Sequence, residues 1–156
     1  MVERRMQIAV SGAGRCSEPV WQLAEEVGRE IARHGAVLIC GGLGGVMEAA
    51  ARGARAAGGL TVGILPSYDS ASANAWLDVV IPTGLGHARN VVLVASGDAV
   101  IALPGEQGTA SEIALALKLQ RCVIALEAWQ DHVGVLHATS PAEAVRLAIT
   151  TFGGAA

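Results

Sequence analysis

The chain has 156 residues, of which 52% are hydrophobic and 16% are charged, and its formal net charge is −3. Its length suits one domain, which we place over residues 1–156. The acidic balance argues against a nucleic-acid-binding protein, because such proteins need a basic surface that displaces counterions from phosphates.

Short apolar runs alternate along the chain with longer segments of helical periodicity. Predicted strands occupy residues 7–12, 36–40, 60–66, 78–84, 98–105 and 122–126, with 133–138 as a candidate seventh. Predicted helices occupy residues 18–33, 46–57, 87–95, 109–120 and 141–150. Strands that are apolar throughout and alternate with helices indicate a parallel sheet with helices on both faces. The predicted fold class is therefore α/β, a doubly wound parallel sheet of six or seven strands.

Glycine-rich turns follow four of these predicted strands. In doubly wound sheets, ligands bind outside the carboxyl ends of the strands. Glycine lets backbone N–H groups approach an anion closely, and helix N-termini add unpaired donors. We therefore expect this edge to bind a phosphate-bearing small molecule. The candidate binding residues are Gly12, Gly14, Arg15, Gly41, Gly42, Gly44, Gly45, Arg89, Asn90, Pro104, Gly105, Gly108 and Thr109.

Two charged residues are candidates for the chemistry of this site. Arg89 begins an otherwise apolar helix, so its charge needs a partner, and a bound anion suits the fixed fork of guanidinium donors. Glu112 has two interpretations, between which the sequence does not decide. In the first, Thr109 and Glu112 form a capping box at the start of a helix. In the second, the Glu112 carboxylate bonds a sugar hydroxyl or activates water at the rim of the site.

Familiar nucleotide and metal motifs are missing from the sequence. The first turn, GAGRCS, lacks the third glycine of GxGxxG, and glycines stand where the acid of a dinucleotide site is expected. GxxxxGK[ST] is absent, and Lys118 is the only lysine. The three cysteines and four histidines have no zinc-ligand spacing, so we expect no bound metal.

The location and assembly of the protein also follow from its apolar residues. No apolar run is long enough to span a membrane, and the first residues do not resemble a signal peptide. We therefore expect a cytoplasmic protein with no membrane partner. The segment 111–119, SEIALALKL, is apolar almost all round, so one of its sides is expected to contact the sheet and the other a second copy of the chain.

Three segments together are similar to the signature blocks of a known family. They are GGLGGVMEAAARGA at 41–54, HARN at 87–90 and PGEQGTASE at 104–112. They resemble the LOG-like proteins, once misnamed lysine decarboxylases, and the pair Arg89–Asn90 looks more like the molybdenum-cofactor carrier branch. The resemblance covers nearly the whole chain in order and spacing. It implies a Rossmann-like fold that assembles as a homodimer or homotetramer.

The resemblance implies two alternative functions. One is storage or delivery of molybdenum cofactor or a nucleotide; the other is hydrolysis of the N-glycosidic bond of nucleoside 5′-monophosphates, for which Arg89 and Glu112 match the catalytic pair. Asn90 and Glu106 depart from the hydrolase pattern, which has a lysine and the second glycine of PGG in their places. A carboxylate beside a phosphate repels it unless it points away or binds an arginine. We therefore expect a binding protein, with a phosphoribohydrolase as the alternative and a glycine-rich edge used only for packing as a third hypothesis.

Overall fold

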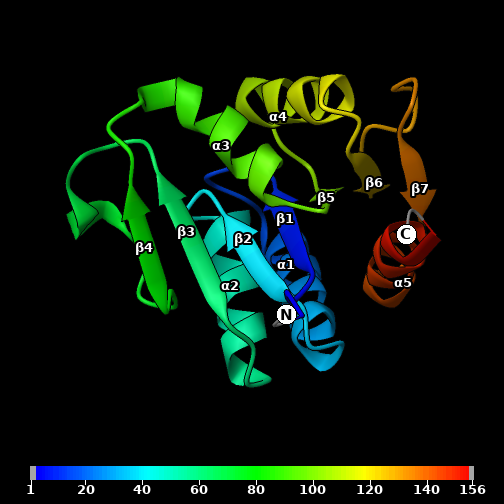
Figure 1. Ribbon diagram of the computed structural model, residues 1–156, viewed down its shortest axis with the longest axis horizontal. Coiled ribbons are helices and arrows are strands. Elements are labelled where there is room, and N and C mark those ends of the chain that lie inside the picture. Colours follow the sequence, from blue (N-terminus) through cyan, green and yellow to red (C-terminus); the bar gives the residue numbers. More distant parts are fainter. Residues whose placement is uncertain (1–2, 155–156) are drawn as a thin grey trace.

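A computed structural model of the chain describes residues 3–154, which form one sheet of seven parallel strands with helices on both faces (Figure 1). The strands are β1 (Gln7–Ser11), β2 (Val37–Cys40), β3 (Thr61–Leu65), β4 (Val79–Pro82), β5 (Ala99–Ala102), β6 (Cys122–Leu126) and β7 (Leu136–Ala138). The helices are α1 (Glu18–Arg33), α2 (Val46–Ala56), α3 (Arg89–Ser96), α4 (Gln107–Lys118) and α5 (Pro141–Gly154). The predicted α/β fold class is confirmed, including the candidate seventh strand.

The order of the strands is β4-β3-β2-β1-β5-β6-β7. The chain therefore builds the sheet outward from β1 in one direction, then crosses over and continues from β5 in the other. Such a reversal between two neighbouring strands opens a crevice at their carboxyl ends, because the connections that follow them leave toward opposite faces. The pair β1 and β5 is hydrogen-bonded over Ile8–Ala99 to Ser11–Ala102. The expected position for a ligand is therefore directly beyond Ser11.

Alternate side chains of β1 point into two separate cores. Ile8 and Val10 pack with α1, α2 and α5 on one face, whereas Ala9 packs with α3 and α4 on the other. All three residues are fully buried. This double coverage explains why the run is apolar at every position and does not alternate with polar residues.

The sheet is less covered at its edge than the sequence suggests. Strand β4 lies at the end of the strand order, and its apolar side chains Val79 and Ile81 are 42% and 43% exposed. The helices on the two faces of the sheet therefore do not cover this strand completely. An edge strand has a neighbour on one side only, so an apolar composition does not by itself guarantee burial.

Helix α4 contacts the sheet on one side, as its apolar sequence predicts. Ile113 and Ala116 are fully buried in the core to which α3 also contributes, whereas Leu119, the residue after the helix, is exposed. Val91 of the adjacent α3 is exposed as well. A homodimer or homotetramer that covers these side chains stays a prediction.

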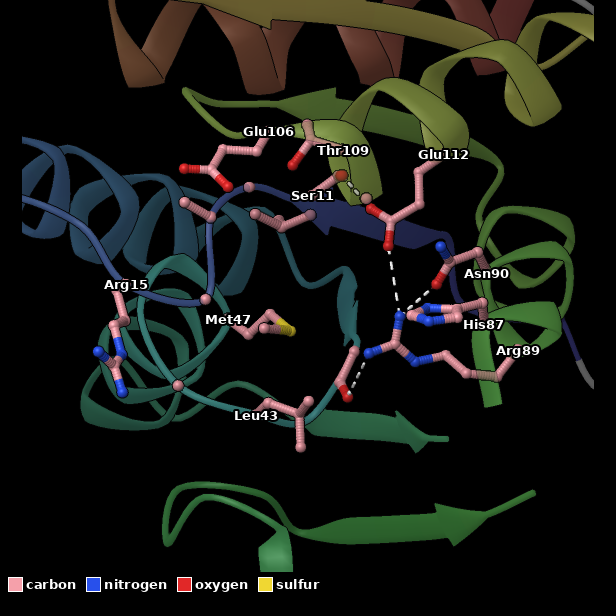
Figure 2. Close-up of a pocket in the computed structure, with 17 residues that line it drawn as sticks. Ser11, Arg15, Leu43, Met47, His87, Arg89, Asn90, Glu106, Thr109 and Glu112 are labelled. Carbon is pink, nitrogen blue, oxygen red and sulfur yellow. Dashed lines mark hydrogen bonds and ion pairs between the residues drawn. The ribbon is translucent and has the colours of Figure 1, made fainter. Parts of the chain in front are cut away.

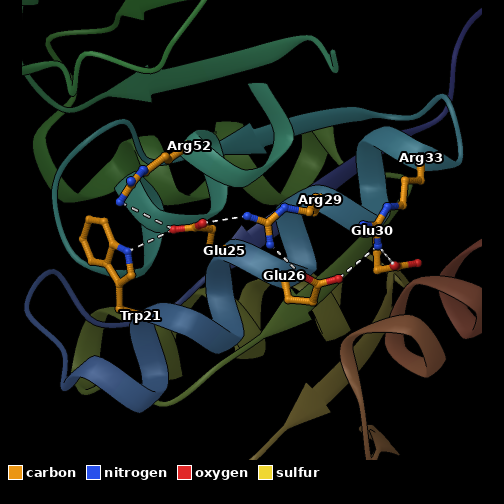
Figure 3. Close-up of polar contacts among 7 residues, drawn as sticks. All are labelled: Trp21, Glu25, Glu26, Arg29, Glu30, Arg33 and Arg52. Carbon is orange, nitrogen blue, oxygen red and sulfur yellow. Dashed lines mark hydrogen bonds and ion pairs between the residues drawn. The ribbon is translucent and has the colours of Figure 1, made fainter. Parts of the chain in front are cut away.

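Many of the charged residues lie on α1, at a distance from the crevice. Arg29 bonds Glu25 at 2.7 Å and Glu26 at 2.6 Å, and Arg52 of α2 approaches Glu25 at 3.7 Å (Figure 3). Exposed pairs of this kind contribute little to stability, about 0–1 kcal/mol each. These pairs lie on the surface of α1 and α2.

Within residues 3–154, no helix is long and apolar enough to cross a membrane.

Candidate ligand-binding pocket

A cavity of about 550 Å³ lies at the carboxyl ends of β1, β2 and β5. Three loops and the beginnings of α3 and α4 form its wall (Figure 2). Most of the residues predicted for the site line this cavity. They are Gly12, Gly14, Arg15, Gly41, Gly44, Arg89, Asn90, Gly108, Thr109 and Glu112. Their role in binding a ligand stays a prediction, but the fold brings them together from four separate segments.

The other four predicted residues lie behind the wall of the cavity. Gly42 and Gly45 have φ angles of +79° and +63°, which favour glycine, and a Cβ on Gly45 would overlap the loop after β1. A Cβ on Gly105 would overlap the Thr109 side chain. The Pro104 carbonyl accepts a hydrogen bond from Ala13 N at 3.0 Å. These residues shape the loops and do not themselves line the cavity.

Arg89 and Glu112 meet inside the cavity (Figure 2). Arg89 is the first residue of α3 and is 8% exposed, and its Nη1 donates to Glu112 Oε1 at 3.5 Å. Nη1 also donates to Asn90 Oδ1, and Nη2 donates to the Gly41 carbonyl at 3.4 Å. The room for this guanidinium comes from Gly41, because a Cβ there would lie 2.8 Å from Nη2. The Arg89 charge is therefore partnered by the protein's own carboxylate.

Ser11 is a residue of this network that was not predicted from the sequence. Its hydroxyl donates a hydrogen bond to Glu112 Oε2, and it is 2% exposed. The signal available in the sequence was a polar residue directly after the apolar run Ile8–Val10, at the strand end where ligands bind. Apolar Leu43 and Met47 also line the cavity and belong to the glycine-rich segment itself.

Of the two interpretations of Glu112, the capping box is wrong. Helix α4 begins at Gln107, with Glu106 in the N-cap position, so Thr109 already lies within the first turn. The Glu112 side chain turns inward to Ser11 and Arg89. The sequence pattern could not show this, because it does not reveal that a hydroxyl and a guanidinium from other elements compete for the same carboxylate.

Burial changes the acid–base properties of this network. Burial raises the pKa of the Glu112 carboxyl, while the Ser11 hydrogen bond and the Arg89 charge oppose that rise. Burial lowers the pKa of the Arg89 guanidinium, and the charge of Glu112 opposes this change. Nearby Cys40 is fully buried, and its burial raises the pKa of its thiol to about 11, so it stays protonated and acts in packing. The Arg89–Glu112 pair is therefore poorly hydrated.

The first turn of α4 has unused hydrogen-bond donors. In the described part of the chain, no acceptor bonds the N–H groups of Gln107, Gly108 and Thr109, whereas the first N–H of α2, on Val46, donates to the Ala13 carbonyl at 2.9 Å. Unpaired N–H groups at a helix start bind anions. The N–H groups of Met47 and Glu48 in α2 also have no acceptor among residues 3–154, so the first turn of α4 offers one more unpaired donor than that of α2.

Two glycines in the wall are not required by the fold. A Cβ on Gly108 would meet nothing within 4 Å, and a Cβ on Gly14 would only approach Met47 Cε at 3.9 Å. Neither residue has a positive φ. Packing therefore does not require glycine at these two positions, and the lack of side chains there leaves the cavity open.

Among residues 3–154, one more donor and one charge in the wall are without a partner. Arg89 Nε is buried and has no hydrogen-bond acceptor among the residues described. Arg15 is exposed on the loop after β1, and its guanidinium points away from the Arg89 cluster (Figure 2).

In residues 3–154, no three His, Cys, Asp or Glu side chains are grouped so that they could hold a metal ion.

The chain belongs to the SLOG cluster4 family, which it matches over residues 5–151. The resemblance to LOG-like proteins and molybdenum-cofactor carriers that the three motifs indicate is thereby confirmed.

Two similar solved structures cover nearly the whole chain. The molybdenum cofactor binding protein of Rippkaea orientalis has a TM-score of 0.90 and 40% identity, over 96% of this chain and 99% of that one. The molybdenum cofactor carrier protein of Chlamydomonas reinhardtii has a TM-score of 0.85 and 34% identity, over 97% and 99% of the two chains.

Two relatives are similar in sequence. An uncharacterized protein of Archaeoglobus fulgidus is 48% identical over 146 residues, which are 94% of this chain and 96% of that protein. The cytokinin riboside 5′-monophosphate phosphoribohydrolase of Rhodococcoides fascians is 40% identical over 95 residues, 58% of this chain and 48% of that one. The match to the hydrolase thus spans about half of its length, whereas the matches to the two molybdenum cofactor proteins are nearly complete.

Proposed function

We propose that the protein binds a phosphate-bearing small molecule in this pocket, for storage or delivery, and that the molecule is molybdenum cofactor. The likeness to two proteins named for this cofactor extends over nearly the full length of both chains. The cofactor is cargo in this proposal, and its phosphate is the part for which the pocket offers recognisable partners.

The amides at the start of α4 would hold the phosphate. The N–H groups of Gln107, Gly108 and Thr109 are unpaired, and the positive end of the helix dipole lies at the same place. Because Gly14 and Gly108 have no side chains, an anion would have room to approach these donors. The unpaired Nε of Arg89 adds a buried donor to the same cavity.

The contacts of Glu112 are the observation that favours a binding protein over an enzyme. Both of its carboxylate oxygens are engaged, one by Ser11 and the other by Arg89, and the residue is 7% exposed. A catalytic carboxylate must reach the substrate atom on which it acts. Here Arg89 and Glu112, which match the hydrolase residues, bond each other, and the guanidinium of Arg89 also donates to Asn90.

A phosphoribohydrolase is the second candidate, because Arg89 and Glu112 do lie together in one cavity. If a substrate displaced the contacts between them, Glu112 would stabilise the oxocarbenium-like transition state and orient water, while Arg89 would hold the phosphate. The sequence match to the Rhodococcoides fascians enzyme supports this candidate.

A panel of nucleoside 5′-monophosphates separates the two functions. We expect the protein to release no free base from AMP, GMP, CMP or UMP, measured by chromatography, because Glu112 stays bonded to Ser11 and Arg89. We also expect protein purified from cofactor-producing cells to contain molybdenum. Base release that disappears in Glu112→Gln would instead establish the hydrolase.

A further inference from the structure

Glu106 is the one acidic residue of the pocket wall to which the proposed function gives no role. Glu106 lines the cavity and is exposed (Figure 2). It occupies the N-cap position of α4, yet its side chain makes no capping hydrogen bond. Among residues 3–154 it has no ion pair or side-chain hydrogen bond.

The charges around Glu106 do not balance it. Arg89 is paired with Glu112 at 3.5 Å, so these two charges compensate each other. Arg15 is the remaining arginine of the wall, and Figure 2 shows its side chain directed away from Glu106. A phosphate held by the N–H groups of Gly108 and Thr109 would thus lie within a few residues of an uncompensated carboxylate. Two neighbouring anions repel each other unless a cation lies between them.

We propose that Glu106 and the phosphate of the ligand together bind a hydrated divalent cation of the Mg²⁺ type. Such cations prefer oxygen ligands, and they are often held by one or two carboxylates, substrate phosphates and water. The described residues provide no group of three metal-binding side chains. The cation therefore needs the phosphate oxygens and binds together with the ligand. This inference rests on the proposed phosphate site at the start of α4.

Ribose 5-phosphate and Mn²⁺ are suitable probes, because this sugar phosphate has no N-glycosidic bond that could be hydrolysed. Free Mn²⁺ is measured by electron paramagnetic resonance, and sugar phosphate binding by calorimetry with Mn²⁺ or with EDTA. We expect each probe to tighten the binding of the other by about tenfold, an equal factor in both directions by linkage. In Glu106→Gln this coupling should vanish, and the affinity in EDTA should exceed that of the unaltered protein.

The exposed Glu3, which precedes the first strand, gives a matched control: Glu3→Gln should keep the coupling. Coupling that persists in Glu106→Gln, or its absence in the unaltered protein while ribose 5-phosphate still binds, would overturn the cation bridge alone. If ribose 5-phosphate bound to neither protein under any condition, the proposed phosphate site would fail and the bridge with it.

Discussion

Replacing Arg89 with methionine is expected to lower the free energy of unfolding by about 3–5 kcal/mol, because it removes one partner of a buried ion pair. The Glu112 carboxylate would keep its Ser11 hydrogen bond but lose the guanidinium 3.5 Å away. Urea denaturation at pH 7 measures this loss. Methionine retains the length and much of the volume of the side chain, so a large cavity is not the cause.

The loss should depend on pH in a defined direction. Burial already raises the pKa of Glu112, and removal of the Arg89 charge, which opposes that rise, would raise it further. A group with a raised folded-state pKa contributes stability below its unfolded pKa, about 4.3, and loses it as the pH rises through the folded value. The deficit of Arg89→Met should therefore be largest at neutral pH and shrink as the pH falls toward 4.

The double variant Arg89→Met/Glu112→Gln is the control for this prediction. It removes both charges and keeps an amide where the carboxylate was, so most of the stability lost in Arg89→Met should return at pH 7. A deficit that does not change with pH and persists in the double variant would contradict a charged Glu112 paired with Arg89.

Replacing Gly108 with valine should abolish most ligand binding and leave stability intact. The Cβ would meet no protein atom within 4 Å, so the side chain would extend into open space beside the unpaired N–H groups. Valine has a somewhat higher helix propensity than glycine, and the melting temperature should therefore stay equal or rise slightly. We expect the affinity for ribose 5-phosphate to fall by a factor of ten or more, about 1.4 kcal/mol, measured by calorimetry.

Gly153 in α5 offers a matched control, because a Cβ there also meets nothing within 4 Å and the helix lies outside the pocket. Gly153→Val should keep both stability and affinity. Unchanged binding in Gly108→Val would show that the first turn of α4 does not contact the ligand, and a melting temperature lowered by several degrees would show that Gly108 is needed for folding.

The sheet could be predicted from the sequence because its signals are local. Strand β1 contains the short apolar run Ile8–Val10 before the polar Ser11, and β2 is a short apolar run that ends before Gly41. The helix over 18–33 is found with the predicted bounds. The exposure of β4 could not be predicted, because it depends on the position of the strand at the edge of the sheet, which its own residues do not encode.

The pocket could be located from the sequence, but its internal contacts could not. Glycine-rich turns indicated the correct edge, since carboxyl ends of parallel strands always share one edge. The partner of Arg89 was expected to be a bound anion, and in the structure it is Glu112, 23 residues along the chain. Spacing within one helix suggested a cap for Glu112, whereas the contact that decides its place comes from Ser11, 101 residues away.

Backbone N–H groups at the start of α4 are proposed to bind the phosphate of a small ligand. Titration of ¹⁵N-labelled protein with ribose 5-phosphate, followed by amide chemical shifts, tests it most directly. We predict that the largest shifts fall on the amides of Gln107, Gly108 and Thr109, with smaller ones around Gly14 and Gly44. Shifts confined to other surfaces, or none at concentrations where phosphate sites are normally filled, would contradict the account.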